Sequence, residues 1–368
     1  MIDKIFEFKK SFLFQLSVFI FARFISCTLI FIYLPLYDPR FFTFKDLEFY
    51  KEVSAGIFTP NFLYAYLIKF IGYNSSNIHS YSSLIISFII SIIIFSPWIF
   101  ISRKILKNNL AILYSIFLGL HPYLSLYSLK FDSTTFAVLP VAFFALQRFL
   151  PSKKFNIVPL FTTTISSFFR SQILLLAWAQ LFQISINKNS GFLRKIKFKQ
   201  FLILILLVFC SLIQFGYGAD ILTQNFGCYT LPNIENFFLE KGFFEPISIF
   251  LAYLFTPIIH LILLLSARES IAIYCINLPK QFASYWQLNI ISTISFLSFH
   301  AFCLFKMLKW IFLNNKYKDY FLLIPFILIL PNLYGMSHMR YFICFIPYVM
   351  LFLFDIKNLR NISYKNNL

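Results

Sequence analysis

Charged side chains are scarce in this sequence. Asp, Glu, Lys and Arg make up 12% of the 368 residues, whereas about a quarter is usual in a soluble domain. Hydrophobic residues make up 59%, and the mean hydropathy is +0.76. A water-soluble core cannot hide this much apolar surface, because the buried fraction grows only slowly with chain length. The composition excludes a soluble domain and predicts an all-α, polytopic membrane protein.

Several motifs and segment types are also missing. The six cysteines form no Cys-x-x-Cys pair, so no metal or redox motif is present. Without an internal repeat or a linker rich in Gly, Pro or Ser, the chain is interpreted as a single membrane domain over residues 1–368. The first apolar run is too long for the core of a signal peptide and lacks a small-x-small site, so we expect it to remain as an anchor. The 53 Phe are interpreted as lipid-facing side chains rather than as a cofactor site.

Long apolar runs recur along the chain, and crossing a bilayer takes about 20 such residues. Spanning segments must be helical, because lipid tolerates no unpaired backbone. We therefore expect about 10–12 transmembrane helices. The apolar segment 61–72 is too short to span and is predicted to be an amphipathic helix at the membrane surface, within the first outer loop, residues 38–81. The candidate spans lie near 11–37, 82–101, 109–127, 133–150, 157–169, 171–187, 201–217, 247–266, 289–308, 320–334 and 341–355.

The net charge of +18 comes from Lys and Arg in short loops. On a soluble chain this charge would suggest nucleic-acid binding, but between apolar runs it indicates topology. If the first six spans form hairpins, the basic segments near 4–10, 103–107, 153–154 and 188–199 share one side, which we assign to the cytoplasm. The basic tail is also expected there, and this requires one more or one fewer crossing between about 217 and 290.

Nine of the fourteen acids fall in the loops assigned to the opposite, outer side. Asp46 and Glu48 lie in the first outer loop, where a carboxylate could serve as a general base or a metal ligand beside the membrane. The alternative is a solvated loop that contains these acids by chance.

Basic and other polar side chains are also expected at the outer face. The segment "HPYLSLYSLKFD" contains His121, Lys130 and Asp132, with Pro122 expected to break the helix. An alternative role for this segment is anchoring at the interface. Further candidates come from "FFRSQ" and "SHMRY", for which a water-facing turn is the alternative: Arg170, His338, Arg340 and Tyr341.

These candidates combine carboxylates with cations from hairpins that are distant in sequence. Arginine presents a planar fork of donors that suits phosphate. A carboxylate could accept a proton from a hydroxyl acceptor while cations stabilise a departing phosphate. The combination predicts group transfer at the outer face.

Four segments carry a resemblance to a known family: "FKDLEFYKEVSAG", "LGLHPYLSLYSLKFDSTTF", "TTISSFFRSQILLLA" and "SHMRYFICFIPYVMLF". Together they make the chain similar to the GT-C superfamily of integral-membrane glycosyltransferases, most of all to the small bacterial mannosyl- and aminoarabinosyl-transferase-like members. The resemblance covers most of the chain with loose motifs. It implies an enzyme of the bacterial inner membrane that transfers a sugar, with inversion, from a polyprenyl-phosphate donor to a hydroxyl of a glycan, lipid or protein on the outer face.

The resemblance also implies roles for individual residues. Asp46 would match the catalytic carboxylate, with Glu48 as a substitute, and Arg170, His338 and Arg340 would contact phosphate or acceptor. Some family members bind a divalent metal, for which Asp46 and Asp132 are the candidate ligands here. The alternatives are a flippase or transporter of lipid-linked glycans, a polysaccharide polymerase, or a structural membrane protein.

Overall fold

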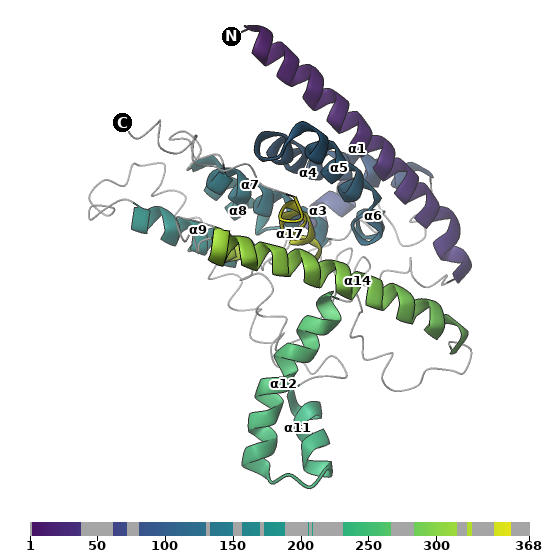
Figure 1. Ribbon diagram of the computed structural model, residues 1–368, viewed down its shortest axis with the longest axis vertical. Helices are drawn as coiled ribbons and strands as arrows, with labels where there is room; N and C mark the ends of the chain where they lie inside the picture. The colour runs from purple at the N-terminus through teal and green to yellow at the C-terminus, as the bar shows by residue number, and fades with distance from the viewer. Residues whose placement is uncertain are drawn as a thin grey trace. The chain divides into compact units, whose positions relative to one another are not determined.

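The computed structural model of the chain is helical throughout its described part (Figure 1). No strand occurs among the described residues, so the all-α prediction is confirmed for that part of the chain. The structure describes residues 2–37, 62–71, 81–129, 133–149, 157–169, 173–187, 205, 208, 231–265, 283–314, 322–325 and 342–354.

Four described helical segments are long and apolar enough to cross a membrane, and they support an integral membrane protein. These segments are Ser11–Ile32, Ile85–Ile105, Glu245–Ile262 and Ile294–Leu313. A fifth crossing results if the helices α5 (Asn108–Leu120) and α6 (Pro122–Leu129), which meet at an angle of 51°, form one bent span. The expected total of about 10–12 spans stays a prediction.

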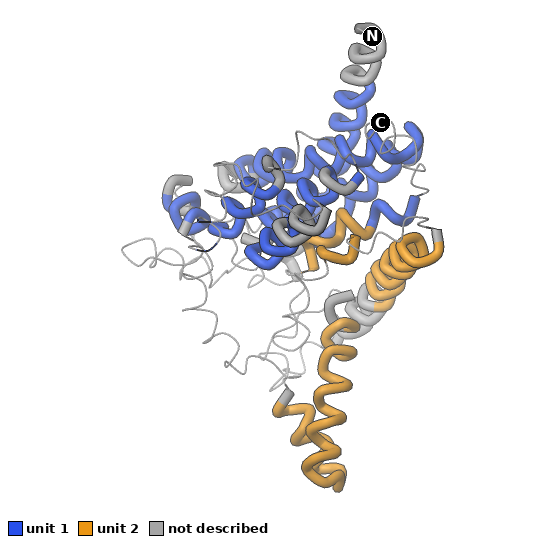
Figure 2. Tube along the Cα trace, turned by 90° about the vertical axis from the view of Figure 1, so that its left-hand side faces the viewer, with its two compact units in different colours: residues 1–214, 350–368 blue, residues 215–349 orange. Residues whose placement is uncertain are grey.

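The chain divides into two compact units, which Figure 2 colours separately. Unit 1 comprises residues 1–214 and 350–368, and unit 2 comprises residues 215–349. The single membrane domain inferred from composition stays a prediction.

Unit 1 is a helical bundle built around its first helix. Besides α5 and α6, its elements include the 3₁₀ helix η3 (Ser133–Ala137) and the helices α1 (Ile2–Tyr37), α3 (Phe62–Ile71), α4 (Tyr81–Ile105), α7 (Val138–Phe149), α8 (Ile157–Ser166) and α9 (Ile173–Asn187). Figure 1 shows α4, α5 and α6 beside α1, and α1 packs most extensively on α5.

The helices α1 and α4 run antiparallel. Three aromatic ring pairs join them, and the residue number rises along α1 as it falls along α4. The pairs are Phe12–Phe100, Phe19–Phe95 and Phe24–Phe88, with ring centroids 6.3, 6.2 and 6.0 Å apart. This order agrees with the hairpin that the basic loops predict.

The helices α1 and α5 pack closely because Gly119 has no side chain. A Cβ placed on Gly119 would lie 2.6 Å from the Cβ of Ala22 and 3.0 Å from the carbonyl oxygen of Phe19. Small residues at helix interfaces let backbones approach within a membrane. This contact holds the N-terminal helix against the end of α5, just before the bend to α6.

A proline lies inside α4 without ending the helix. Pro97 has no N–H to donate to the carbonyl oxygen of Ile93, four residues earlier. The hydroxyl of Ser96 donates to that oxygen instead, at 2.9 Å. A serine that satisfies a freed carbonyl is how spanning helices tolerate proline, so α4 continues from Tyr81 to Ile105.

Unit 2 contains a helical hairpin and a long helix. The hairpin joins α11 (Leu231–Glu240) to α12 (Glu245–Leu265) through Gly242, whose φ of 87° suits glycine. The long helix α14 (Ala283–Lys309) continues as the π-helical turn η5 (Trp310–Asn314). The short helix α17 (Ile346–Leu351) begins at the end of this unit.

Several predicted boundaries differ from the observed ones. The first helix begins at Ile2 rather than at residue 11. The predicted span 133–150 consists of η3 followed by α7. The helical segment that contains the predicted span near 289–308 continues through residue 314. Segment 62–71 is helical as predicted, and its position at a membrane surface stays a prediction.

Candidate functional site

Most of the side chains predicted to form the site fall outside the described residues. Asp46, Glu48, Lys130, Asp132, Arg170, His338, Arg340 and Tyr341 are in this group. Their predicted roles stay predictions. What the structure does describe is the position of the helices and turns that flank several of them.

His121 is the predicted site residue that the structure describes, and it lies buried at the break between α5 and α6. Its Nδ1 accepts a hydrogen bond from the backbone N–H of Leu124 at 3.4 Å, and its carbonyl oxygen accepts one from the N–H of Ser125 at 3.1 Å. Helix α6 begins at the following residue, Pro122, which needs no N–H partner at that position. His121 therefore caps α6, and its predicted contact with substrate stays a prediction.

Three aromatic side chains in contact lie within or beside three of the connections that we predicted to be on the outer side. Phe136 of η3 stacks on Phe169 with ring centroids 4.9 Å apart and planes 13° apart. Tyr64 of α3 makes an edge contact with the ring of Phe136, with ring centroids 6.1 Å apart. Tyr64 belongs to the first outer loop, η3 directly follows Asp132, and Phe169 directly precedes Arg170. Described residues that lie within or beside connections distant in sequence therefore meet in unit 1.

A buried arginine on α1 is the main polar feature of the described bundle. Arg23 has no exposed surface and lies near the midpoint of the spanning segment Ser11–Ile32. Its Nη1 donates to the hydroxyl oxygen of Ser125 at 2.8 Å. The guanidinium carbon lies 4.5 Å from the ring centroid of Phe95 and 5.3 Å from that of Phe19. These distances are within the range of cation–π attraction.

The other two guanidinium nitrogens of Arg23 differ from Nη1 in their hydrogen bonding. Nε and Nη2 are buried and have no hydrogen-bond partner in the described part of the chain. No ion pair of Arg23 occurs among those residues either. A charge inside a membrane span is costly and marks a functional site by default. Arg23 is therefore the strongest functional candidate among the described residues.

A second polar contact joins α1 to two other helices, two turns before Arg23. The Nε2 of Gln15 lies 2.8 Å from each of three acceptors: the hydroxyl of Ser102, the carbonyl of Ala111 and the hydroxyl of Ser115. Both hydroxyls donate to backbone carbonyls, which leaves their oxygens free to accept from Gln15. This side chain ties α1 to α4 and α5.

The prediction of site residues from sequence missed Arg23 and Gln15. The signal was present, because Arg23 is the sole charged residue between Lys10 and Asp38. Gln15 and Arg23 are eight residues apart and so lie on one helix face. The opposite face of α1 is apolar and exposed, with Phe21 66% and Phe24 56% accessible. The helix thus places polar groups inside and apolar groups outside, as lipid requires.

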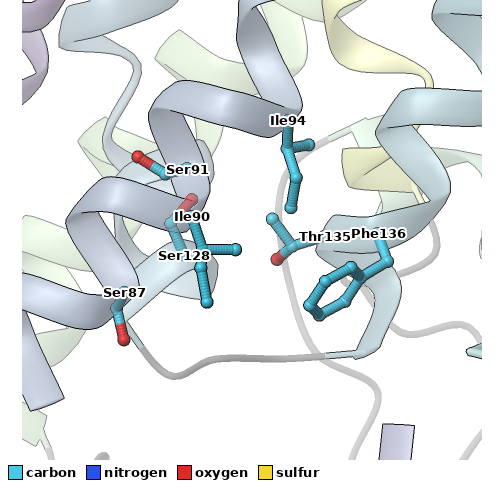
Figure 3. A pocket seen from close by; sticks show the side chains of 7 residues that line it. All are labelled: Ser87, Ile90, Ser91, Ile94, Ser128, Thr135 and Phe136. Atoms are coloured by element: carbon cyan, nitrogen blue, oxygen red, sulfur yellow. The ribbon is translucent and has the colours of Figure 1, made fainter. Parts of the chain in front are cut away.

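A small pocket lined with hydroxyl groups lies between α4, α6 and η3 (Figure 3). Its free volume is about 10 Å³, which is room for about one water molecule. Ser87 is buried, and its hydroxyl has no hydrogen-bond partner among the described residues. The other lining residues are Ile90, Ser91, Ile94, Ser128, Thr135 and Phe136.

Two residues that line the pocket lie one helical turn from residues that contact Arg23. Ser91 is one helical turn from Phe95 along α4, and Ser128 is one turn from Ser125 along α6. In both helices the pocket residue lies toward the contact of Tyr64, Phe136 and Phe169. Polar groups therefore extend from that contact toward the centre of α1.

Among the described residues, no group of three or more His, Cys, Asp or Glu could hold a metal ion. No protein-family model matches the chain, and neither the search of curated proteins nor the search of solved structures found a match.

Proposed function

We propose that this chain is a polytopic glycosyltransferase of the bacterial inner membrane, of the GT-C type. It transfers a sugar from a polyprenyl-phosphate donor to a hydroxyl acceptor on the outer face. The observation that carries the proposal is the contact of Tyr64, Phe136 and Phe169, because the candidate residues follow or precede the elements that meet there.

The proposed chemistry uses a carboxylate and cations in complementary roles. The carboxylate of Asp46 accepts the proton of the acceptor hydroxyl, and the hydroxyl oxygen forms a bond to the anomeric carbon. The bond from that carbon to the phosphate oxygen breaks, and the phosphate leaves with the electron pair. Attack opposite the leaving group inverts the anomeric centre. Lys130 and Arg170 stabilise the negative charge that develops on the phosphate.

A transporter of lipid-linked glycans is the second candidate. The buried polar groups of α1, from Gln15 to Arg23, favour it because such groups in a span can mark a substrate path. A transporter would need no carboxylate base. The two candidates therefore differ in what they require of Asp46.

The test is sugar transfer in membrane vesicles that contain the full chain and a polyprenyl-phosphate sugar. We expect Asp46→Asn to lower the rate by roughly 100-fold or more, because a general base contributes about 10²–10⁴-fold. The matched control is Glu52→Gln in the same loop, which should keep the wild-type rate. Full transfer by Asp46→Asn at normal expression would exclude the assigned base. Translocation without transfer would favour the transporter.

A further inference from the structure

The guanidinium of Arg23 has one edge that is held and one that has no partner in the described part of the chain. Nη1 is held by Ser125, while Nε and Nη2 have no partner among the described residues. Nε–H and one N–H of Nη2 lie side by side on the same edge of the planar group. That edge is the fork that binds two oxygens of a phosphate or carboxylate at once.

Two aromatic rings hold this fork in place, and no carboxylate among the described residues pairs with its charge. The ring of Phe95 lies against the guanidinium at 4.5 Å, and that of Phe19 lies at 5.3 Å. Burying donors without acceptors in an apolar environment is unfavourable. A group that brings oxygen acceptors to Nε and Nη2 would remove this cost. An arginine that is oriented and unpaired is therefore suited to an oxyanion.

The pocket of Figure 3 is lined by α4, α6 and η3, and two of these helices also contact Arg23. Its hydroxyl groups on Ser91 and Ser128 lie one helical turn from the residues that contact Arg23. The hydroxyls of Ser91 and Ser128 donate to the carbonyl oxygens of Phe88 and Leu124. The fork of Arg23 by itself matches two oxygens of a phosphate. Within a membrane bundle, the phosphate carrier is a lipid.

We propose that Arg23 is a binding residue for the phosphate group of a lipid, which its Nε and Nη2 edge would hold. The inference goes beyond the proposed function, because it concerns binding and holds whether or not a sugar is transferred. The lipid is either a polyprenyl phosphate or a membrane phospholipid. Both supply the same oxyanion, and separate probes distinguish them.

The experiment measures lipid binding to the full chain, purified in a detergent without phosphate. The probes are polyprenyl monophosphate, phosphatidylglycerol and, as the neutral counterpart, polyprenol. We expect at least one phosphate lipid to bind more tightly than polyprenol. Arg23→Gln should weaken that binding by roughly tenfold or more, because it removes two charge-assisted hydrogen bonds. The phosphate lipid that responds identifies the source of the oxyanion.

Two further variants separate binding from folding. Arg103→Gln makes the same chemical change at the end of α4 and should leave the binding unchanged. Ser125→Ala keeps the charge of Arg23 but releases Nη1, so it should weaken binding less than Arg23→Gln does. If Arg23→Gln does not fold, weaker phosphate-lipid binding by folded Ser125→Ala supports the proposal, and unchanged binding contradicts it.

Three results would overturn the inference. Equal binding of the phosphate lipids by folded Arg23→Gln and wild type would show that Arg23 has a packing role. Equal binding of polyprenol and both phosphate lipids by wild type would show that the phosphate is not recognised. Binding of none of the probes would also exclude the site. These results do not depend on Asp46, so failure here and failure of the transferase proposal are distinguishable.

Discussion

At the scale of single residues, α1 has two buried polar side chains with different roles. The Nε2 of Gln15 is fully used, because three acceptors on α4 and α5 surround it, while its Oε1 has no partner among the described residues. Two of the three nitrogens of the Arg23 guanidinium have no hydrogen-bond partner among the described residues. A satisfied polar contact inside a bundle joins helices, whereas an unsatisfied charge invites a ligand. We therefore assign Gln15 to structure and Arg23 to binding.

The structural role of Gln15 predicts a loss of stability in Gln15→Ala. The change removes the contacts of Nε2 and leaves a cavity, so we expect the free energy of unfolding to fall by about 1–3 kcal/mol. Thermal unfolding of the purified protein in detergent measures the effect. Ser17→Ala is the control on the same helix: its hydroxyl bonds to the backbone of Leu13, and its loss should change stability by less than about 0.5 kcal/mol. Equal stability of both variants would refute the role of Gln15.

At the scale of helices, the order of contacts along α1 determines the direction of its neighbours. In the aromatic pairs between α1 and α4, the residue number rises along α1 as it falls along α4. The contacts with α5 and α6 run in the same direction, since Gln15 meets Ala111 and Arg23 meets Ser125. A helix that enters a membrane, returns as α4 and crosses again as the bent pair accounts for both directions.

The antiparallel register predicts which cysteine pairs can be joined. In a background without native cysteines, Phe12→Cys with Phe100→Cys should form a cross-link with a short bifunctional reagent, because those rings are 6.3 Å apart. Phe12→Cys with Phe88→Cys is the matched control and should not react, since Phe88 pairs with Phe24 at the other end of the contact. The yield is measured by gel shift after proteolysis between the helices. Cross-linking of the control pair alone would mean that α1 and α4 run parallel.

At the scale of the whole molecule, the basic segments and the apolar helices together predict the topology. The described helices α1, α4, the α5–α6 pair, α7, α8 and α9 alternate with connections that are basic on one side by sequence. The contacts of Phe136 with Tyr64 and Phe169 join the other set of connections. The proposed function depends on this sidedness, because donor phosphate and acceptor must meet there.

The topology predicts the labelling of cysteines introduced at Lys45 and Lys195. On intact cells without native cysteines in the protein, a membrane-impermeant maleimide should label Lys45→Cys and not Lys195→Cys. After permeabilisation, both should react. Lys107→Cys, at an exposed position after α4, should behave as Lys195→Cys does. Labelling of positions 45 and 195 on the same side would contradict the topology on which the proposed site depends.

The amino-acid sequence by itself determined the class of structure. Apolar runs in a chain with few charges must form helices, because a backbone in lipid has to satisfy its own hydrogen bonds. The break before Pro122 was predictable for the same kind of local reason, since proline cannot donate within a helix. Helix ends were harder to predict: α14 and η5 continue to residue 314, past the predicted end of the span near residue 308.

Only the tertiary structure decided which side chains meet. The run from residue 11 to 37 is apolar on all sides apart from a few positions, so its local pattern does not tell which face meets protein. Arg23 is matched with Ser125, 102 residues away, and Gln15 with Ser115, 100 residues away. The stacking of Phe136 on Phe169 likewise joins separate hairpins. Such pairings depend on how helices pack, and packing is a property of the folded chain rather than of any one segment.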